Sequence, residues 1–232
     1  MSNIYIDGMY ATLNPTWHEE DSSFKAKYIA AILTKNGITF DTVAEIGCGS
    51  GAVLKNLSRL VNRPSVSWKG FDIAREPIIR AKSDVLDEVE FHCQDLFKLD
   101  EKFDVLLAID VLEHVPDYIG FLTQCRNKAR YKIYHIPLDL HVSALLRDSL
   151  TNARESVGHL HYFTRSTAIA TLVDTGHTII DTQLTPGAIE LVKLHPSLKR
   201  TIANLPRLVI SQFNPELSTR LLGGHSLLVI AE

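Results

Sequence analysis

The chain of 232 residues has a formal net charge of −3, with 45% hydrophobic and 22% charged residues. These proportions are those of an ordinary globular protein, and the length suits one sizeable domain. The charge gives no electrostatic footprint for nucleic acid or for an anionic membrane, so we expect neither as a partner.

Strands and helices are predicted to alternate along the first 140 residues. Strand-like segments occupy 42–47, 66–73, 88–95, 102–111 and 131–137. Apolar residues at helical spacing occur at about 22–36, after Gly51, through Ile78 and Ile79, and at about 118–129. The run at 102–111 is typical of a strand buried on both faces. This order predicts βαβ units and a parallel sheet.

The last third of the chain has a different pattern. Residues 177–184 and 225–232 are strand-like, and prolines at 186, 196, 206 and 215 interrupt the interval between them. Since loops carry specificity, we expect residues of about 185–224 to form a substrate-side insertion. No linker is visible, and residues 1–232 are therefore predicted to form a single domain.

The stretch GCGSGA, residues 47–52, lies between a predicted strand and a predicted helix. Gly47 and Gly49 allow a sharp turn and a close approach to a ligand, and the helix N-terminus near Gly51 favours an anion. The stretch fits the loose dinucleotide pattern, and Asp72, 21 positions after Gly51, suits hydrogen bonds to ribose hydroxyls. These features alone leave NAD, FAD and other adenosine-containing ligands open.

Acidic residues beside this stretch favour a ligand with a positive charge. Glu45 lies within the first strand, where it would repel a pyrophosphate and attract an ammonium group. Asp95 follows the third strand, where it can accept a hydrogen bond from an adenine amine. Asp110, Glu113 and His114 follow the fourth strand, at the sheet edge where α/β proteins bind ligands.

Four blocks in order resemble those of class I S-adenosylmethionine-dependent methyltransferases. They are VAEIGCGSG (43–51), GFDI (70–73), QDL (94–96) and DVLEHV (110–115). The resemblance extends over about residues 25–140 and implies an α/β, Rossmann-like, doubly wound, mostly parallel seven-stranded sheet with a C-terminal antiparallel hairpin strand. It also implies an S-adenosylmethionine cofactor, with S-adenosylhomocysteine as product. Separately, Trp17 and His18 precede the first predicted helix, and we expect an N-terminal lid segment of about residues 1–24 that could close over the cofactor.

The resemblance implies a set of cofactor-binding residues. They are Glu45, Gly47, Cys48, Gly49, Gly51, Asp72, Ile73, Gln94, Asp95, Leu96 and Asp110. Glu45 would lie near the ammonium group, Asp72 would bind the ribose, and Ile73 would pack on the adenine. Asp95 would meet the adenine amine, and Asp110 would lie at the methionine end, close to the methyl acceptor.

The segments 14–29 and 158–164 resemble bacterial methyltransferases of polysaccharide or natural-product biosynthesis. This resemblance implies a small-molecule acceptor, such as a saccharide or natural-product hydroxyl. A hydroxyl needs a base, and the catalytic candidates are His114, His159, His161 and Asp110. His114 is favoured because its place at the strand edge is better defined, while a purely structural role for it remains an alternative.

Two other function classes stay open. One is a non-catalytic S-adenosylmethionine-binding module or partner subunit, and the other is an NAD-dependent oxidoreductase, which Glu45 disfavours. Three cysteines without metal-ligand spacing predict reduced thiols and no metal site. The absence of a secretory signal and of a membrane span predicts a cytoplasmic protein, which we expect to be a monomer or homodimer.

Overall fold

The structure is a computed structural model that describes residues 19–83, 88–194 and 196–232. Its centre is a seven-stranded sheet with the strand order β3-β2-β1-β4-β5-β7-β6. The strands are β1 (Thr42–Ile46), β2 (Ser67–Asp72), β3 (Val89–Cys93), β4 (Phe103–Ile109), β5 (Ala129–Pro137), β6 (Ile179–Thr185) and β7 (Ser226–Ala231). Only β7 runs antiparallel to its neighbours, β5 and β6, while β1 to β5 pair in parallel. The predicted fold class is confirmed.

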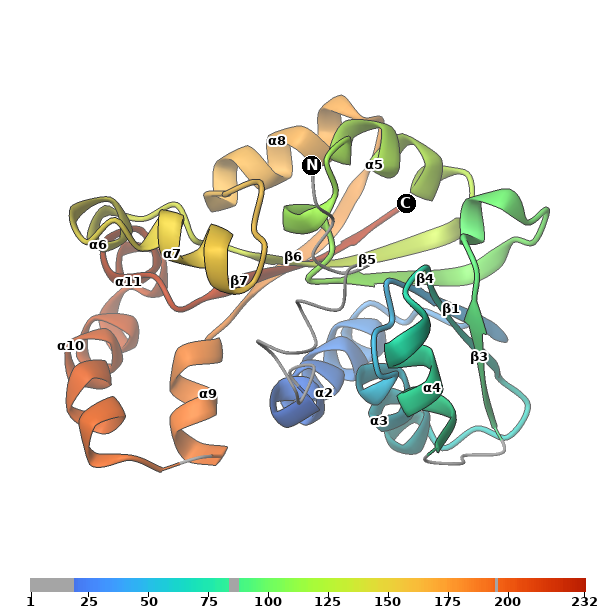
Figure 1. Ribbon diagram of the computed structural model, residues 1–232, viewed down its shortest axis with the longest axis horizontal. Helices are drawn as coiled ribbons and strands as arrows, with labels where there is room; N and C mark the ends of the chain where they lie inside the picture. Colours follow the sequence, from blue (N-terminus) through green and yellow to red (C-terminus); the bar gives the residue numbers. More distant parts are fainter. Residues whose placement is uncertain (1–18, 84–87, 195) are drawn as a thin grey trace.

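Helices cover both faces of the sheet (Figure 1). Helices α2 (Glu19–Lys35), α3 (Ala52–Val61) and α4 (Arg75–Ser83) lie on one face, and α5 (Tyr118–Arg126) and α8 (Arg165–Asp174) lie on the other. Short 3-10 turns, η1 (Leu96–Lys98) and η2 (Leu112–His114), follow β3 and β4. Because β1 to β5 run in parallel, their carboxyl ends all lie at the same edge of the sheet.

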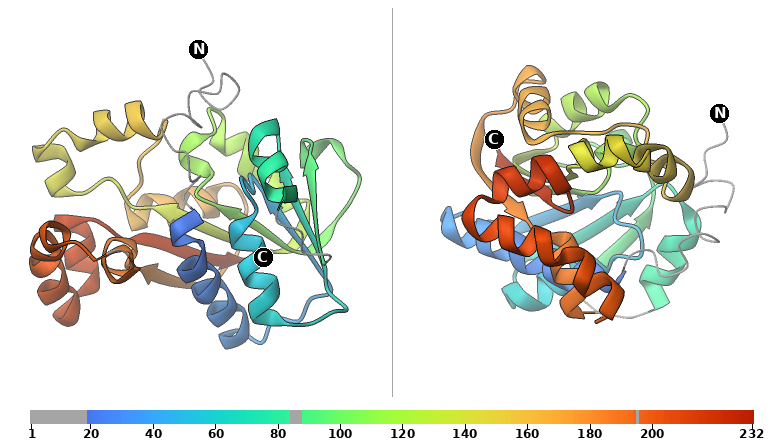
Figure 2. Two further views of the ribbon diagram at one scale, coloured as in Figure 1. Left: turned by 60° about the horizontal axis from the view of Figure 1, so that its bottom comes forward. Right: turned by 90° about the vertical axis from the view of Figure 1, so that its left-hand side faces the viewer.

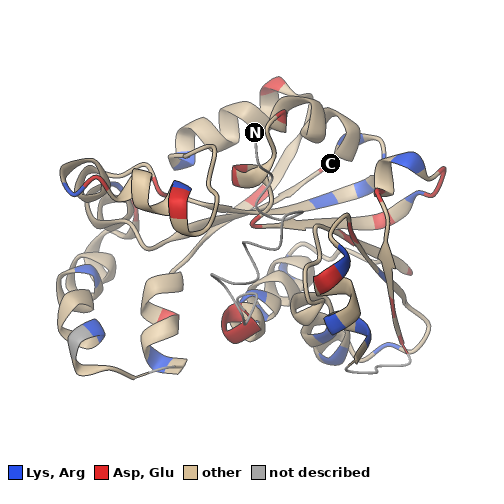
Figure 3. Cartoon of the chain, in the orientation of Figure 1, with Lys and Arg blue, Asp and Glu red and all other residues tan. Residues whose placement is uncertain are grey.

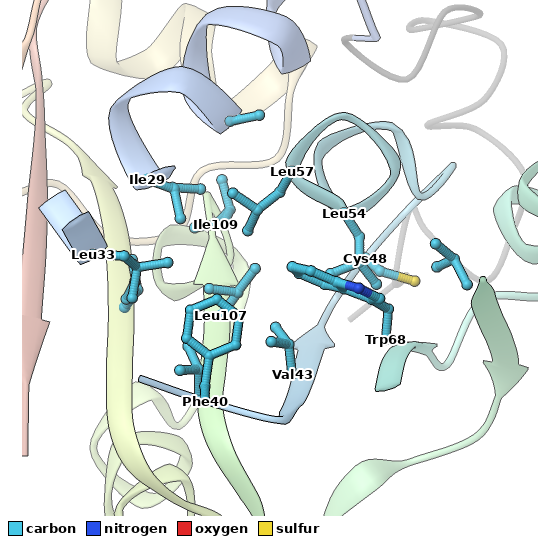
Figure 4. Packing of buried hydrophobic residues seen from close by; sticks show 14 of the residues in the cluster. Ile29, Leu33, Phe40, Val43, Cys48, Leu54, Leu57, Trp68, Leu107 and Ile109 are labelled. Carbon is cyan, nitrogen blue, oxygen red and sulfur yellow. The ribbon is translucent and has the colours of Figure 1, made fainter. Parts of the chain in front are cut away.

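Two apolar clusters hold the layers together. Alternate residues of a strand point to opposite faces, so Val43 packs toward α2 and α3 while its neighbour Ala44 packs toward α5 and α8. Figure 4 shows the first cluster, where Trp68 lies between the sheet and Leu54 of α3. Strands β1 and β4 are therefore buried on both faces of the sheet.

Three helices occupy the interval between β6 and β7. They are α9 (Gly187–Leu194), α10 (Leu198–Phe213) and α11 (Pro215–Leu222), which follow β6 in the chain and lie together as the orange and red helices of Figure 2. Pro215 occupies the first turn of α11, where its missing N–H costs nothing, whereas Pro206 lies inside α10. The substrate-side role of about residues 185–224 stays a prediction.

A helical segment that the sequence patterns left unassigned connects β5 to β6. It contains α6 (Val142–Leu146) and α7 (Ser149–Ser156), and α8 follows it. No residue of α7 is buried, so α7 carries no periodic apolar signal. Strand β5 also begins at Ala129, two residues before its predicted start, because Ala129 pairs with Phe103.

Charged residues of both signs are interspersed along the helices (Figure 3). The acidic residues Glu19, Glu20 and Asp21 form the first turn of α2, where they interact favourably with the helix dipole. Within the part of the chain that the structure describes, no helix combines the length and apolar character needed to cross a membrane.

Candidate functional site

A cavity of about 530 Å³ opens at the carboxyl ends of β1, β2 and β4. This volume is in the range of small-molecule sites. Its wall is formed by the first turns of α2, the glycine loop after β1, the ends of β2 and β4, η2 and residues 157–159. Nine of the predicted site residues lie in that wall: Glu45, Gly47, Cys48, Gly49, Asp72, Ile73, Asp110, His114 and His159.

The glycine loop turns sharply between β1 and α3. Gly47 and Gly49 have φ angles of 68° and 53°, in the left-handed region that favours glycine. Asp72 holds the loop, since its Oδ2 accepts a hydrogen bond from the Gly49 N–H at 2.9 Å and its Oδ1 accepts one from the Ala74 N–H at 2.8 Å. Burial raises the pKa of Asp72, against the effect of these hydrogen bonds. Asp72 therefore joins the loop to the end of β2.

Glu45 is buried directly beneath the glycine loop. The residue is 2% exposed, and its Oε2 has no hydrogen-bond partner among the described residues. Burial, with the nearby charge of Asp72, raises its pKa to about 8, although Lys25 and the Leu54 N–H oppose the shift. A buried acceptor without a partner is costly. A ligand ammonium group in the cavity would satisfy it.

Ile73 and Cys48 give the cavity apolar surface on either side of the loop. Ile73 is 63% exposed although it lines the cavity, so it presents an uncovered apolar side chain to a ligand. Cys48 is buried, and burial raises the pKa of its thiol well above the usual value, which keeps it neutral and unreactive.

Five predicted site residues lie outside the cavity wall. Gly51 lies behind the loop against Phe91, and Leu96 is fully buried in the core under β2. Asp95 caps η1 by accepting a hydrogen bond from the Phe97 N–H at 3.0 Å, and Gln94 precedes it. His161 turns away, with its Nε2 3.0 Å from the Val115 carbonyl oxygen. The cofactor contacts of Gln94, Asp95 and Leu96 stay predictions, as does the catalytic role of His161.

A chain of polar groups, with Lys25, His135 and Thr185 buried and Asp21 and Asp110 half-buried, runs along the cavity, and the sequence patterns do not predict most of it. Lys25 of α2 lies between two carboxylates, with its Nζ 2.6 Å from Asp110 Oδ2 and 2.8 Å from Asp21 Oδ2. Asp110 Oδ1 lies 2.5 Å from His135 Nδ1, and His135 Nε2 lies 2.8 Å from Thr185 Oγ1. His135 is thus a satisfied buried histidine that also holds Asp110.

The environment keeps Asp110 ionised. Burial by itself would raise its pKa, but the charges of His135 and Lys25 hold that pKa well below the usual range. Burial likewise opposes the charge of Lys25, but Asp110 and Asp21 raise its pKa above the usual value. Asp110 also has a φ of 53°, a conformation that aspartate tolerates better than most residues and that occurs at functional sites. The only sequence signal for Lys25 is its spacing of four residues from Asp21.

The predicted lid falls largely outside the described residues, which begin at residue 19. Its last part, 19–24, forms the start of α2, from which Asp21 and Ser22 line the cavity. Closure over a ligand stays a prediction.

The comparisons with known proteins agree with this geometry. Residues 17–182 match a family described as "Methyltransferase domain", and the chain belongs to this family. A ubiquinone biosynthesis O-methyltransferase from Actinobacillus pleuropneumoniae is 27% identical over 129 residues, which cover 48% of this chain and 53% of that protein. The chain thus spans about half the length of the curated relatives it matches.

Solved structures show the same fold. A magnesium protoporphyrin IX methyltransferase from Synechocystis PCC 6803, with bound SAH, superposes with a TM-score of 0.60 at 16% identity, covering 91% of this chain and 83% of that one. The plantazolicin methyltransferase BpumL, in complex with a monoazolic desmethylPZN analog and SAH, has a TM-score of 0.52 at 17% identity, covering 96% of this chain and 88% of that one. The predicted family, the class I S-adenosylmethionine-dependent methyltransferases, is confirmed.

Proposed function

We propose that this protein transfers the methyl group of S-adenosylmethionine to a hydroxyl oxygen of a small molecule. One observation carries the proposal: a single cavity joins the glycine loop and Glu45, whose Oε2 has no hydrogen-bond partner among the described residues, at one end to Asp110, His114 and His159 at the other. The first end suits a cofactor with an ammonium group. The second end suits an acceptor that must lose a proton.

The residues present fit the cofactor. Glu45 can accept hydrogen bonds from its ammonium group, and Asp72 retains acceptor capacity for the ribose hydroxyls beyond its two backbone contacts. Ile73 offers the exposed apolar surface on which the adenine can pack. When bound, the cofactor supplies an electrophilic methyl group on a sulfonium sulfur and is released as S-adenosylhomocysteine.

The acceptor end of the cavity supports attack by a hydroxyl oxygen. Asp110 is held in one position by Lys25 and His135, so it can orient an acceptor hydroxyl without moving. The imidazoles of His114 and His159 lie in the same wall, where they can assist removal of the hydroxyl proton. The curated relatives are named as O-methyltransferases, which supports oxygen as the methylated atom.

Calorimetric titration tests the cofactor, and a product assay tests the reaction. We expect saturable binding of S-adenosylmethionine and S-adenosylhomocysteine and no binding of NAD. S-adenosylhomocysteine should then form in the presence of phenolic, polyprenylated or saccharide hydroxyl acceptors. Failure of both adenosyl ligands to bind would overturn the proposal. Binding without turnover over that acceptor panel would favour the non-catalytic binding module instead.

Glu45 predicts a proton linked to cofactor binding. With a pKa of about 8, its carboxyl is mostly protonated at neutral pH, and an ammonium ligand should ionise it. Wild-type protein at pH 7 should therefore release about one proton on binding, and Glu45→Gln should release none and bind the cofactor more weakly by about 1–3 kcal/mol. Calorimetry in two buffers of different ionisation enthalpy measures the proton count. The same count in both proteins would refute this role.

The same shift predicts how the free protein responds to pH. Because the folded pKa of about 8 lies above the usual 4.5, Glu45 contributes stability below pH 4.5, and this contribution is lost as the pH rises through 8. Without cofactor, Glu45→Gln should melt at a higher temperature than wild type at pH 9. Thermal unfolding at pH 6 and pH 9 checks this, and a variant that loses stability relative to wild type as the pH rises would contradict it.

A further inference from the structure

Three side chains from two distant segments meet at the acceptor end of the cavity. Glu113 and His114 belong to η2, directly after β4, and His159 follows α7. One ligand atom from each lies within 4.8 Å of those of the other two, and all three residues line the cavity. The backbone keeps the segments together, since the Glu113 carbonyl accepts hydrogen bonds from the N–H groups of Leu160 at 2.6 Å and His161 at 3.2 Å.

Glu113 is the unusual member of this group. The residue is 1% exposed, and neither carboxyl oxygen has a hydrogen-bond partner among the described residues. His114 Nε2 lies 3.8 Å from its Oε1, beyond hydrogen-bond distance. Leaving a carboxyl buried without a partner costs free energy. A bound cation would supply the missing interaction.

A hydrogen bond at Nδ1 holds each imidazole of this group in place. His159 Nδ1 lies 2.6 Å from Asp139 Oδ2, and His114 Nδ1 lies 3.2 Å from the Gly158 carbonyl oxygen. Each bond places the ring proton on Nδ1 and leaves the lone pair on Nε2. Histidines that bind metals are oriented in this way, by a carboxylate or carbonyl on the other nitrogen.

We propose that Glu113, His114 and His159 bind one divalent transition-metal ion, such as Zn²⁺ or Mn²⁺. Two imidazoles and one carboxylate form a donor set that these ions accept, and three protein ligands leave positions open for the acceptor. Ligand atoms on one ion at about 2.1 Å lie at most about 4.2 Å apart, so small side-chain rotations close the present spacing. The sequence shows no metal-ligand spacing for this group, because His159 lies in a segment far along the chain from Glu113 and His114. The sequence therefore predicted no metal site.

This inference deepens the proposed function and rests on it for its chemical role. An acceptor hydroxyl coordinated to the ion would lose its proton to solvent more readily, because a bound cation lowers the pKa of a coordinated O–H group. Its oxygen then forms the new bond to the methyl carbon while the sulfur–carbon bond breaks. In this arrangement the two histidines assist removal of the hydroxyl proton as ligands of the ion and not as direct bases.

Metal binding can be measured without any methyl acceptor. Protein stripped of metal with a chelator is titrated with Zn²⁺ by calorimetry and with Mn²⁺ by electron paramagnetic resonance. Wild type should bind one ion per chain, and Glu113→Gln and His159→Ala should weaken binding by about 100-fold or more. Asp139→Asn should weaken it by about 10–100-fold, as expected for loss of a ligand's orienting partner. His161→Ala, which changes a neighbouring histidine outside the cluster, should bind like wild type.

Binding of S-adenosylhomocysteine by every variant serves as the control for folding. It also separates this inference from the proposed function, because the two ligands use different ends of the cavity. Absence of saturable metal binding to wild type would overturn the inference. Equal affinity in wild type, Glu113→Gln and His159→Ala would also overturn it, since that result means an adventitious ion only.

Discussion

Replacement of Lys25 by alanine is expected to destabilise the protein by about 3–5 kcal/mol, the range for breaking a buried ion pair. The Lys25 side chain is 8% exposed and lies within 2.8 Å of two carboxylates, those of Asp21 and Asp110. Its removal leaves the half-buried Asp110 carboxylate with His135 Nδ1, at 2.5 Å, as its remaining side-chain contact. The free energy of unfolding, measured by urea denaturation, should show the loss.

Lys27 provides a matched control for this prediction. It lies on the same helix two residues further along, and it is exposed. Lys27→Ala should change the free energy of unfolding by no more than about 0.5 kcal/mol, as is usual for surface substitutions. If Lys25→Ala were as mild as Lys27→Ala, the buried ion pairs of Lys25 would not contribute to stability, and a solvated Lys25 would have to be inferred.

Gly51→Ala is expected to destabilise the protein by about 2–5 kcal/mol and to abolish binding of S-adenosylhomocysteine. Gly51 has a φ of 74°, which costs a residue with a side chain about 1–2 kcal/mol. An added Cβ would lie 2.3 Å from two ring carbons of the buried Phe91, and overpacking of this kind costs about 1–3 kcal/mol more. Relief of the clash must move either the ring or the loop that forms the cofactor end of the cavity.

Gly37→Ala separates the conformational cost of a positive φ from the cost of the clash with Phe91. Gly37 has a φ of 62°, but an added Cβ there has no heavy atom within 4 Å. This variant should therefore lose only the conformational part, about 1–2 kcal/mol, and should bind S-adenosylhomocysteine like wild type. Urea denaturation and calorimetric titration of both variants test the prediction. Equal losses of stability would show that Phe91 does not constrain the loop.

The sequence alone predicted the sheet and the cofactor end of the cavity, for a local reason. The motif residues Glu45, Gly47 and Asp72 lie at the ends of buried strands. Apolar runs and the alternation of strands with helices predict these strands from the sequence. Parallel strands align their carboxyl ends, so residues at these ends converge whatever the helices between them do. Gln94 and Asp95 are the exception to this convergence. The chain turns into η1 directly after β3, so neither residue lies in the cavity wall.

The acceptor end depended on contacts between distant segments. The sequence patterns gave no reason to distinguish His159 from His161. In the structure, hydrogen bonds to the Glu113 carbonyl hold this segment so that His159 lines the cavity. His161 Nε2 instead lies near the Val115 carbonyl oxygen. The segment that carries His159 includes α7, which buries no residue and so leaves no periodic pattern.

The sequence by itself therefore determined the family, the mostly parallel sheet and the residues around the glycine-loop end of the cavity, since all of these follow from short motifs at strand ends. Only the tertiary structure decided that Lys25 and His135 hold Asp110 and that Glu113 is buried beside two imidazoles. The reason is physical. Burial and charge pairing arise where segments far apart in the chain pack together, and no local pattern records which side chains will meet there.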